Sequence, residues 1–181
     1  MIRNKVLISR EGTMTRIAQV VFGFVLGFAA IPLAATKANY SGTYTAKQKG
    51  GKSGDPNPVV IHVTQTDTTI EISRTEGEKS VTNRLPLDGS EADYSSPTGK
   101  HGKGRVQFQG DDLLVEWHAT TSGADGKPIR WHTKERWKSS SDKRTLTVKS
   151  EVDSPDFPPA VMAAALPNNP WTDTYQRTDS P

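Results

Sequence analysis

The 181-residue chain contains no cysteine. This absence excludes disulfide bonds, thiolate catalysis, zinc–thiolate sites and the lipid anchor of bacterial lipoproteins, because each of these needs a thiol. Hydrophobic residues are also scarce, at 33% of the sequence, and part of them lies in one N-terminal block. The chain is therefore too polar for a polytopic membrane protein, a coiled coil or a large α/β enzyme, and its length fits one domain.

Motifs of common hydrolases and nucleotide-binding proteins are missing as well. The chain has no Gly-x-Ser-x-Gly, no His-Glu-x-x-His and no phosphate-binding loop. We therefore expect a protein that is not an enzyme and that uses no cofactor and no metal.

The basic character of the chain comes mostly from its N-terminus. Five of the 23 basic residues and one of the 20 acidic residues lie in the first 38 positions, so the rest of the chain has 18 basic and 19 acidic side chains. A nucleic-acid-binding domain needs an excess of Lys and Arg on one face. We expect no nucleic-acid partner, because the chain beyond residue 38 lacks that excess.

The N-terminal block has the pattern of a secretory signal peptide. Ile17–Ala35 is a run of 19 residues without a charge, and Arg16 precedes it. Thr36 and Ala38 place small residues at positions −3 and −1 of a cut after Ala38, as signal peptidases require. The run is also long enough to serve as an uncleaved membrane anchor.

We therefore predict that residues 1–38 are a signal peptide, with Met14 as an alternative start, and that residues 39–178 form a single domain. The predicted location is the periplasm or the exterior of the cell. No stable membrane insertion is expected once the signal peptide is removed.

Beyond residue 40, apolar and polar residues alternate with a period of two, which is typical of strands with one buried face. Thr, Val, Ile and Trp are enriched there, as in strands. Strands do not alternate with helices as in βαβ units, so no crossover helices and no parallel sheet are expected, and closure removes exposed strand edges. We predict an all-β, up-and-down antiparallel meander of about 8–10 strands that closes into a barrel. The predicted strands lie at Gly42–Lys47, Val59–Val63, Ile70–Ser73, Lys79–Leu87, Glu91–Ser96, Gly104–Gln109, Leu113–Ala119, Ile129–Trp137, Thr145–Val152 and Trp171–Arg177.

Three further segments interrupt this pattern. Gln48–Pro58 and Ser95–Lys103 are rich in Gly, Pro and Lys and are predicted loops. Pro159–Leu166, framed by prolines, is the one candidate for a short helix.

The ends of the strand region resemble those of the lipocalin and calycin barrels. Gly42-Thr43-Tyr44 opens the first strand as Gly-x-Trp does in that family, with Tyr44 in place of Trp, and Arg177 on the last strand matches the family's basic residue. The resemblance implies that Gly42, Tyr44 and Arg177 close the barrel, with the Arg stacked on the aromatic ring.

The stretch Thr133–Trp137, followed by Leu146-Thr147-Val148, is similar to a set of small bacterial secreted lipocalin-like proteins that mostly have no assigned function. The resemblance spans about residues 40–178. Another small closed barrel or sandwich remains the alternative fold.

His118 and His132 lie on two strands that flank the turn Gly123–Gly126. If the hairpin turns near residue 125, His118 faces His132 and Glu116 faces Lys134, which is a favourable cross-strand charge pair. A structural zinc site needs four ligands, and the sequence places no third one here. We expect two histidines on a polar face rather than a metal site.

Glu135 shares the predicted interior face with Trp131 and Trp137, and Trp117 joins that face from the preceding strand. A carboxylate in the interior is costly unless it is paired. We predict a salt bridge from Glu135 to an interior arginine, such as Arg105 or Arg177. The alternatives are a polar contact to a ligand and a general acid.

The three tryptophans are either core residues or the aromatic lining of a ligand site. We predict that Trp117, Trp131, Glu135 and Trp137 bind a small apolar or amphipathic molecule inside a monomeric barrel. The alternative is a filled barrel of the cell envelope that acts through its loops as an interaction or inhibitor protein.

Overall fold

The computed structural model describes residues 38–49, 52–53 and 58–179. The chain divides into two units, Met1–Ala34 and Ala35–Pro181, and the described residues belong to the second. The predicted signal peptide lies outside the described residues, apart from Ala38. No helix among the described residues is long and apolar enough to cross a membrane.

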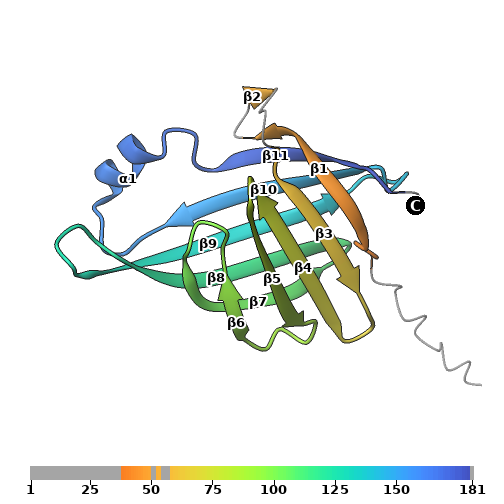
Figure 1. Cartoon of the computed structure of the whole chain (residues 1–181), viewed down its shortest axis with the longest axis horizontal. Coiled ribbons are helices and arrows are strands. Elements are labelled where there is room, and N and C mark those ends of the chain that lie inside the picture. Colours follow the sequence, from red (N-terminus) through yellow and green to blue (C-terminus); the bar gives the residue numbers. More distant parts are fainter. Residues whose placement is uncertain (1–37, 50–51, 54–57, 180–181) are drawn as a thin grey trace, which may run out of the picture. The chain divides into compact units, whose positions relative to one another are not determined.

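The second unit is an antiparallel β-meander with one short helix, as predicted (Figure 1). Its main sheet has the order β5-β4-β3-β1-β11-β10-β9-β8-β7-β6, and the two-residue β2 pairs with β1 beside this path. Every neighbouring pair is antiparallel. The elements are β1 Gly42–Lys49, β2 Lys52–Ser53, β3 Val60–Gln65, β4 Thr69–Glu76, β5 Lys79–Pro86, β6 Ala92–Ser95, β7 His101–Gln109, β8 Asp112–Ser122, β9 Pro128–Ser139, β10 Thr145–Asp153, α1 Pro159–Ala165 and β11 Trp171–Arg177.

The sheet curls into a nearly closed barrel, and its two outer strands, β5 and β6, meet through one side chain. The Asn83 amide nitrogen on β5 donates to the Ser95 carbonyl on β6 at 2.9 Å, and the Ser95 amide donates to Asn83 Oδ1 at 2.7 Å. Asn83 is buried. The Asn83 side chain thus forms hydrogen bonds with the backbone of β6 at the place where β5 and β6 are not joined by backbone hydrogen bonds.

The register of the β8–β9 hairpin agrees with the sequence prediction. His118 faces His132, and Glu116 faces Lys134. Because side chains alternate between the two faces of a strand, this register places Trp117, Trp131, Glu135 and Trp137 on the interior face.

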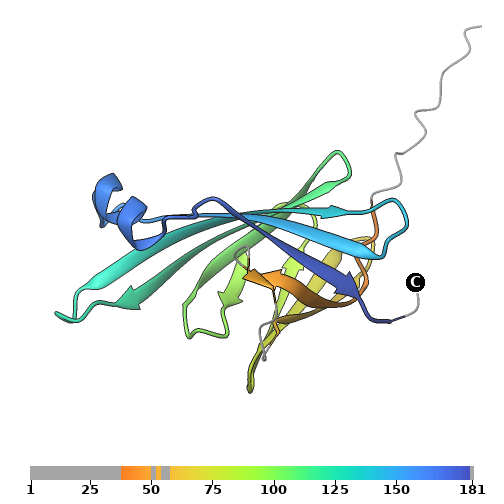
Figure 2. The same ribbon diagram turned by 90° about the horizontal axis from the view of Figure 1, so that it is seen from above.

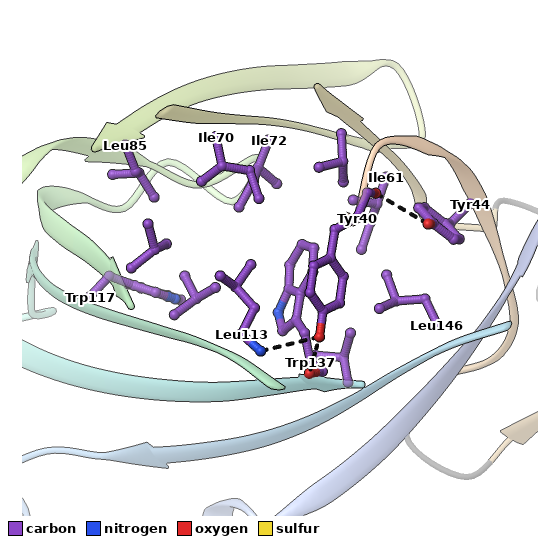
Figure 3. Close-up of a cluster of buried hydrophobic side chains, with 14 of the residues drawn as sticks. Tyr40, Tyr44, Ile61, Ile70, Ile72, Leu85, Leu113, Trp117, Trp137 and Leu146 are labelled. Atoms are coloured by element: carbon purple, nitrogen blue, oxygen red, sulfur yellow. Dashed lines mark hydrogen bonds between the residues drawn. The ribbon is translucent and has the colours of Figure 1, made fainter. Parts of the chain in front are cut away.

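One end of the barrel is filled by aromatic and aliphatic side chains (Figure 3). The Tyr40 hydroxyl lies 2.8 Å from the Asp111 carbonyl and 2.9 Å from the Trp137 carbonyl, and it accepts a hydrogen bond from the Leu113 amide at 3.2 Å. Burial raises the pKa of Tyr40 to about 12. The Tyr44 hydroxyl donates to the Tyr40 carbonyl at 3.1 Å. Tyr40 therefore ties the segment before β1 to the β7–β8 turn and to β9.

The helix α1 lies at the other end, where the β8–β9 hairpin projects from the barrel (Figures 1 and 2). Its bounds differ by one residue from the predicted helix at Pro159–Leu166. Met162 is its one buried residue. The helix therefore presents a small apolar face to the barrel.

Both predicted loops are partly wrong. In the first, Gln48–Pro58, the structure places 48–49 in β1 and 52–53 in β2, and the rest is mostly outside the described residues. In the second, Ser95–Lys103, Ser95 belongs to β6 and His101–Lys103 to β7. Gly102 is one of the glycines that favoured a loop, but it lies within β7. The strand requires glycine there, because a Cβ would lie 1.8 Å from the His118 carbonyl oxygen of the neighbouring β8.

Candidate functional site

The barrel interior is not filled towards α1. A cavity of about 210 Å³, the polar chamber, is lined by Val59 just before β3, by side chains from β4, β6 and β8 to β11, and by the β6–β7 turn. Its polar and charged lining residues include Arg74, Glu76, Tyr94, Lys100, Thr133, Glu135 and Asp173.

An ion pair between β4 and β9 crosses the chamber. Arg74 Nη1 donates to Glu135 Oε1 at 2.9 Å, and Arg74 Nη2 donates to Glu135 Oε2. Trp137 Nε1 donates to Glu135 Oε2 at 2.9 Å. Both carboxylate oxygens are thus engaged, and Glu135 is 3% exposed.

The predicted partners of Glu135 were wrong. Arg105 pairs instead with Glu116, through Nε at 2.8 Å, on the outer face of the barrel. Arg177 lies at the filled end, with Nε 2.8 Å from Asp179 Oδ1. The sequence did not predict Arg74 as the partner of Glu135. Arg74 follows Ile70 and Ile72 at a spacing of two residues and so lies on the same face of β4, but the predicted strand ended at Ser73.

Two polar atoms at the chamber wall have no hydrogen-bond partner among the described residues. Trp117 on β8 and Thr133 on β9 face each other across the ladder, and Trp117 Nε1 and Thr133 Oγ1 are both buried and unpaired. The Trp117 ring stacks on Tyr94, with centroids 4.7 Å apart. Burial raises the pKa of Tyr94 to about 12.

A second cavity adjoins the chamber beneath α1. This apolar pocket has a volume of about 370 Å³, and it shares Lys100, Val152 and Trp171 with the lining of the chamber. Lys100 is its one charged lining residue, and the other side chains are Trp131, Phe157, Val161, Met162, Ala165 and Leu166.

Lys100 stands where the two cavities meet. Its Nζ lies 4.4 Å from the centroid of the Trp131 ring and 5.8 Å from that of Trp117, which are cation–π distances. Partial burial lowers the pKa of Lys100. The turn sequence around Lys100 contains nothing that distinguishes this half-buried lysine from the exposed ones, so the sequence did not predict its role.

The structure brings three of the four predicted ligand-binding residues together. Trp117 and Glu135 line the polar chamber, and Trp131 lines the apolar pocket. Trp137 is fully buried in the filled end and lines neither cavity. It contacts the site through the hydrogen bond to Glu135 and through the Arg74 guanidinium carbon, which lies 5.6 Å from the centroid of its ring.

The three residues predicted to close the barrel meet at the filled end. Tyr44 pairs with Arg177 across β1 and β11, and the Arg177 guanidinium carbon lies 6.0 Å from the centroid of the Tyr44 ring. Gly42 leaves room for that guanidinium, since a Cβ at this position would lie 2.9 Å from Arg177 Cζ.

His118 and His132 stack on the outer face, with ring centroids 4.2 Å apart. His132 Nε2 is buried without a hydrogen-bond partner among the described residues. Burial, together with His118 and Lys134, lowers the pKa of His132. The residues that the structure describes contain no group of three or more His, Cys, Asp or Glu side chains placed to hold a metal ion.

The fold, an antiparallel meander that curls into a nearly closed barrel, is similar to that of solved structures of other proteins. No protein-family model and no curated protein sequence matches the chain. The REP1-NXSQ fatty acid transporter is 11% identical with a TM-score of 0.52, over 78% of this chain and 97% of that protein. Zebrafish ileal bile acid-binding protein, in complex with cholic acid, is 16% identical with a TM-score of 0.50, over 77% of this chain and 98% of that protein.

Proposed function

We propose that this chain is an exported binding protein that holds a small apolar or amphipathic molecule in the half of the barrel next to α1. The observation that carries the proposal is the apolar pocket of about 370 Å³ joined to the polar chamber of about 210 Å³. Small-molecule sites commonly occupy roughly 300–1,000 Å³ and combine an apolar lining with a few polar groups. The two cavities together have this size and this lining.

The solved structures with a similar fold support the same class of ligand. One is a fatty acid transporter and the other binds bile acid, so both take amphipathic molecules. Export, to the periplasm or beyond, rests on the N-terminal sequence pattern and is part of the proposal, as are the bacterial secreted family and the monomeric state.

We further propose that the protein binds its ligand without transforming it. Glu135 is the most deeply buried carboxylate of the chamber, and Arg74 and Trp137 occupy both of its oxygens. A general acid must reach the proton acceptor on its substrate. Glu135 would have to break its ion pair to do so.

The alternative, a filled barrel that acts through its loops, has one supporting observation. The half of the barrel around Tyr40, Tyr44 and Trp137 is fully packed. The half next to α1 is hollow, however, and its lining is apolar where the helix covers it. Ligand binding explains this asymmetry, whereas a scaffold protein gains nothing from it.

Titration of the full-length chain with Nile red, an uncharged apolar dye, tests the proposal. We expect saturable binding with a blue shift of the emission. Ala163 and Ala165 are both exposed residues of α1, but only Ala165 lines the apolar pocket. A165W should fill the pocket and abolish binding, and A163W should leave it unchanged. Absence of saturable binding, or equal binding by both variants, would contradict the proposal.

A further inference from the structure

The unpaired atoms of Trp117 and Thr133 are unusual in their surroundings. Trp117 is 7% exposed and Thr133 is 2% exposed, and both line the chamber. The neighbouring indoles are satisfied, since Trp137 Nε1 donates to Glu135 at 2.9 Å and Trp171 Nε1 donates to Asp173 at 3.1 Å. A buried donor that is left without an acceptor destabilises the structure. Each atom has less than 1 Å² of accessible surface, so a polar group of another molecule would be stabilised here once the chamber wall shifts enough to admit it.

The chemistry of the two atoms defines that group. An indole Nε1–H only donates, whereas a threonine hydroxyl both donates and accepts. One oxygen atom that accepts from Trp117 is able to exchange a second hydrogen bond with Thr133. A hydroxyl or carbonyl oxygen meets this requirement, but an ammonium group does not, because it has no acceptor.

The charges of the chamber disfavour an anion at the same place. Its lining contains three carboxylates, Glu76, Glu135 and Asp173, against two cations, Arg74 and Lys100. The guanidinium of Arg74 is held by both oxygens of Glu135. A ligand carboxylate beside Thr133 would be buried near Glu135, which already holds the Arg74 guanidinium, and burying a charge without a partner costs free energy.

The two cavities also set the orientation of the ligand. The apolar pocket under α1 suits a hydrocarbon body, and the chamber suits the polar end. Lys100, at their junction, is the cation that an anionic ligand would use, and it would hold the acid group at the junction instead of deep in the chamber.

Building on the proposed function, we infer that the ligand is an uncharged amphiphile whose hydroxyl or carbonyl oxygen binds Trp117 Nε1 and Thr133 Oγ1. Its hydrocarbon part extends past Lys100 into the apolar pocket. The site thus selects neutral polar lipids over fatty-acid anions of the same length.

Calorimetric titration of the full-length chain with 1-decanol, decanoate and decylamine at pH 8 tests this inference. We expect decanol to bind at least about tenfold more tightly than the two charged ligands. W117F and T133V should each weaken decanol binding by about 3–10-fold, as the loss of one hydrogen bond predicts. T133S, which keeps the hydroxyl, should restore it, and T147V, on the outer face of β10, should change nothing.

The chemical shift of the Trp117 indole proton gives a second measurement that needs no variant. Decanol should move this proton resonance downfield, because the indole gains an acceptor. Tighter binding of decanoate, lost in K100M and kept in W117F, would overturn the inference while the proposed function stands. Failure of all three ligands to bind would overturn both.

Discussion

Arg74 on β4 and Glu135 on β9 form a two-pronged ion pair across the barrel interior, 61 positions apart in the chain. The pair lies between the filled half around Tyr40 and the hollow half under α1. It is the polar floor of the cavity in which we propose that the ligand binds. Its partners are mostly buried, with side chains 18% and 4% exposed.

Removing one partner of this ion pair should destabilise the protein more than replacing both partners with apolar residues. We expect R74M or E135L alone to cost about 3–5 kcal/mol, because each leaves a buried charge without its partner. The double variant R74M/E135L should recover most of that loss. Urea unfolding of the four proteins measures the effects, and additive losses in the double variant would show that the two side chains do not act as a pair.

Gly102 should tolerate no side chain. A Cβ there would lie 1.8 Å from the His118 carbonyl oxygen and 2.8 Å from the Ala119 Cα, so β7 and β8 would have to separate. We expect G102A to lower the free energy of unfolding by more than about 3 kcal/mol. G104A is the matched control, because its Cβ would meet the Tyr94 side chain at 3.1 Å and no backbone atom at closer range. Equal effects of the two variants in thermal unfolding would refute the strand pairing at Gly102.

The filled end should depend on Arg177 and Tyr44 to a moderate degree. We expect R177M to cost about 1–2 kcal/mol through loss of the cation–π contact and of the bond to Asp179. Y44F keeps the ring and loses only the hydrogen bond to the Tyr40 carbonyl, so about 1 kcal/mol is expected. Unchanged denaturation midpoints in both variants would argue against the predicted closure.

Much of the site can be predicted from the alternation of side chains between the two faces of each strand. The rest depends on contacts between residues that are far apart in the sequence. Alternation alone placed Glu135 beside Trp131 on the interior face, and the turn near residue 125 set the pairing of His118 with His132. The partner of Glu135 could not be chosen in this way, since the contact with Arg74 depends on how the whole sheet curls. The same holds for Lys100, whose position over Trp131 comes from a turn.

The stacked pair of histidines should make stability depend on pH. Burial, then His118 and Lys134, lower the pKa of His132 in the folded protein. The unfolded chain then binds a proton more readily, near pH 6.5, than the folded one does. Stability should therefore be full above pH 6.5 and fall as the pH drops through the lowered pKa.

Unfolding experiments between pH 5 and 8 measure this dependence. H132N should flatten the decline, whereas H62N, at an exposed histidine of β3, should leave it in place. An identical decline in wild type and H132N would mean that other groups cause it.

Native mass spectrometry of the protein recovered from the cells that make it tests the central proposal most directly. The account predicts a retained adduct whose mass fits one uncharged amphiphile, present in wild type and in A163W and lost in A165W. A clean mass without adduct in wild type, at low activation energy and without exposure to detergent, would contradict a ligand-binding barrel and favour a protein that acts through its loops.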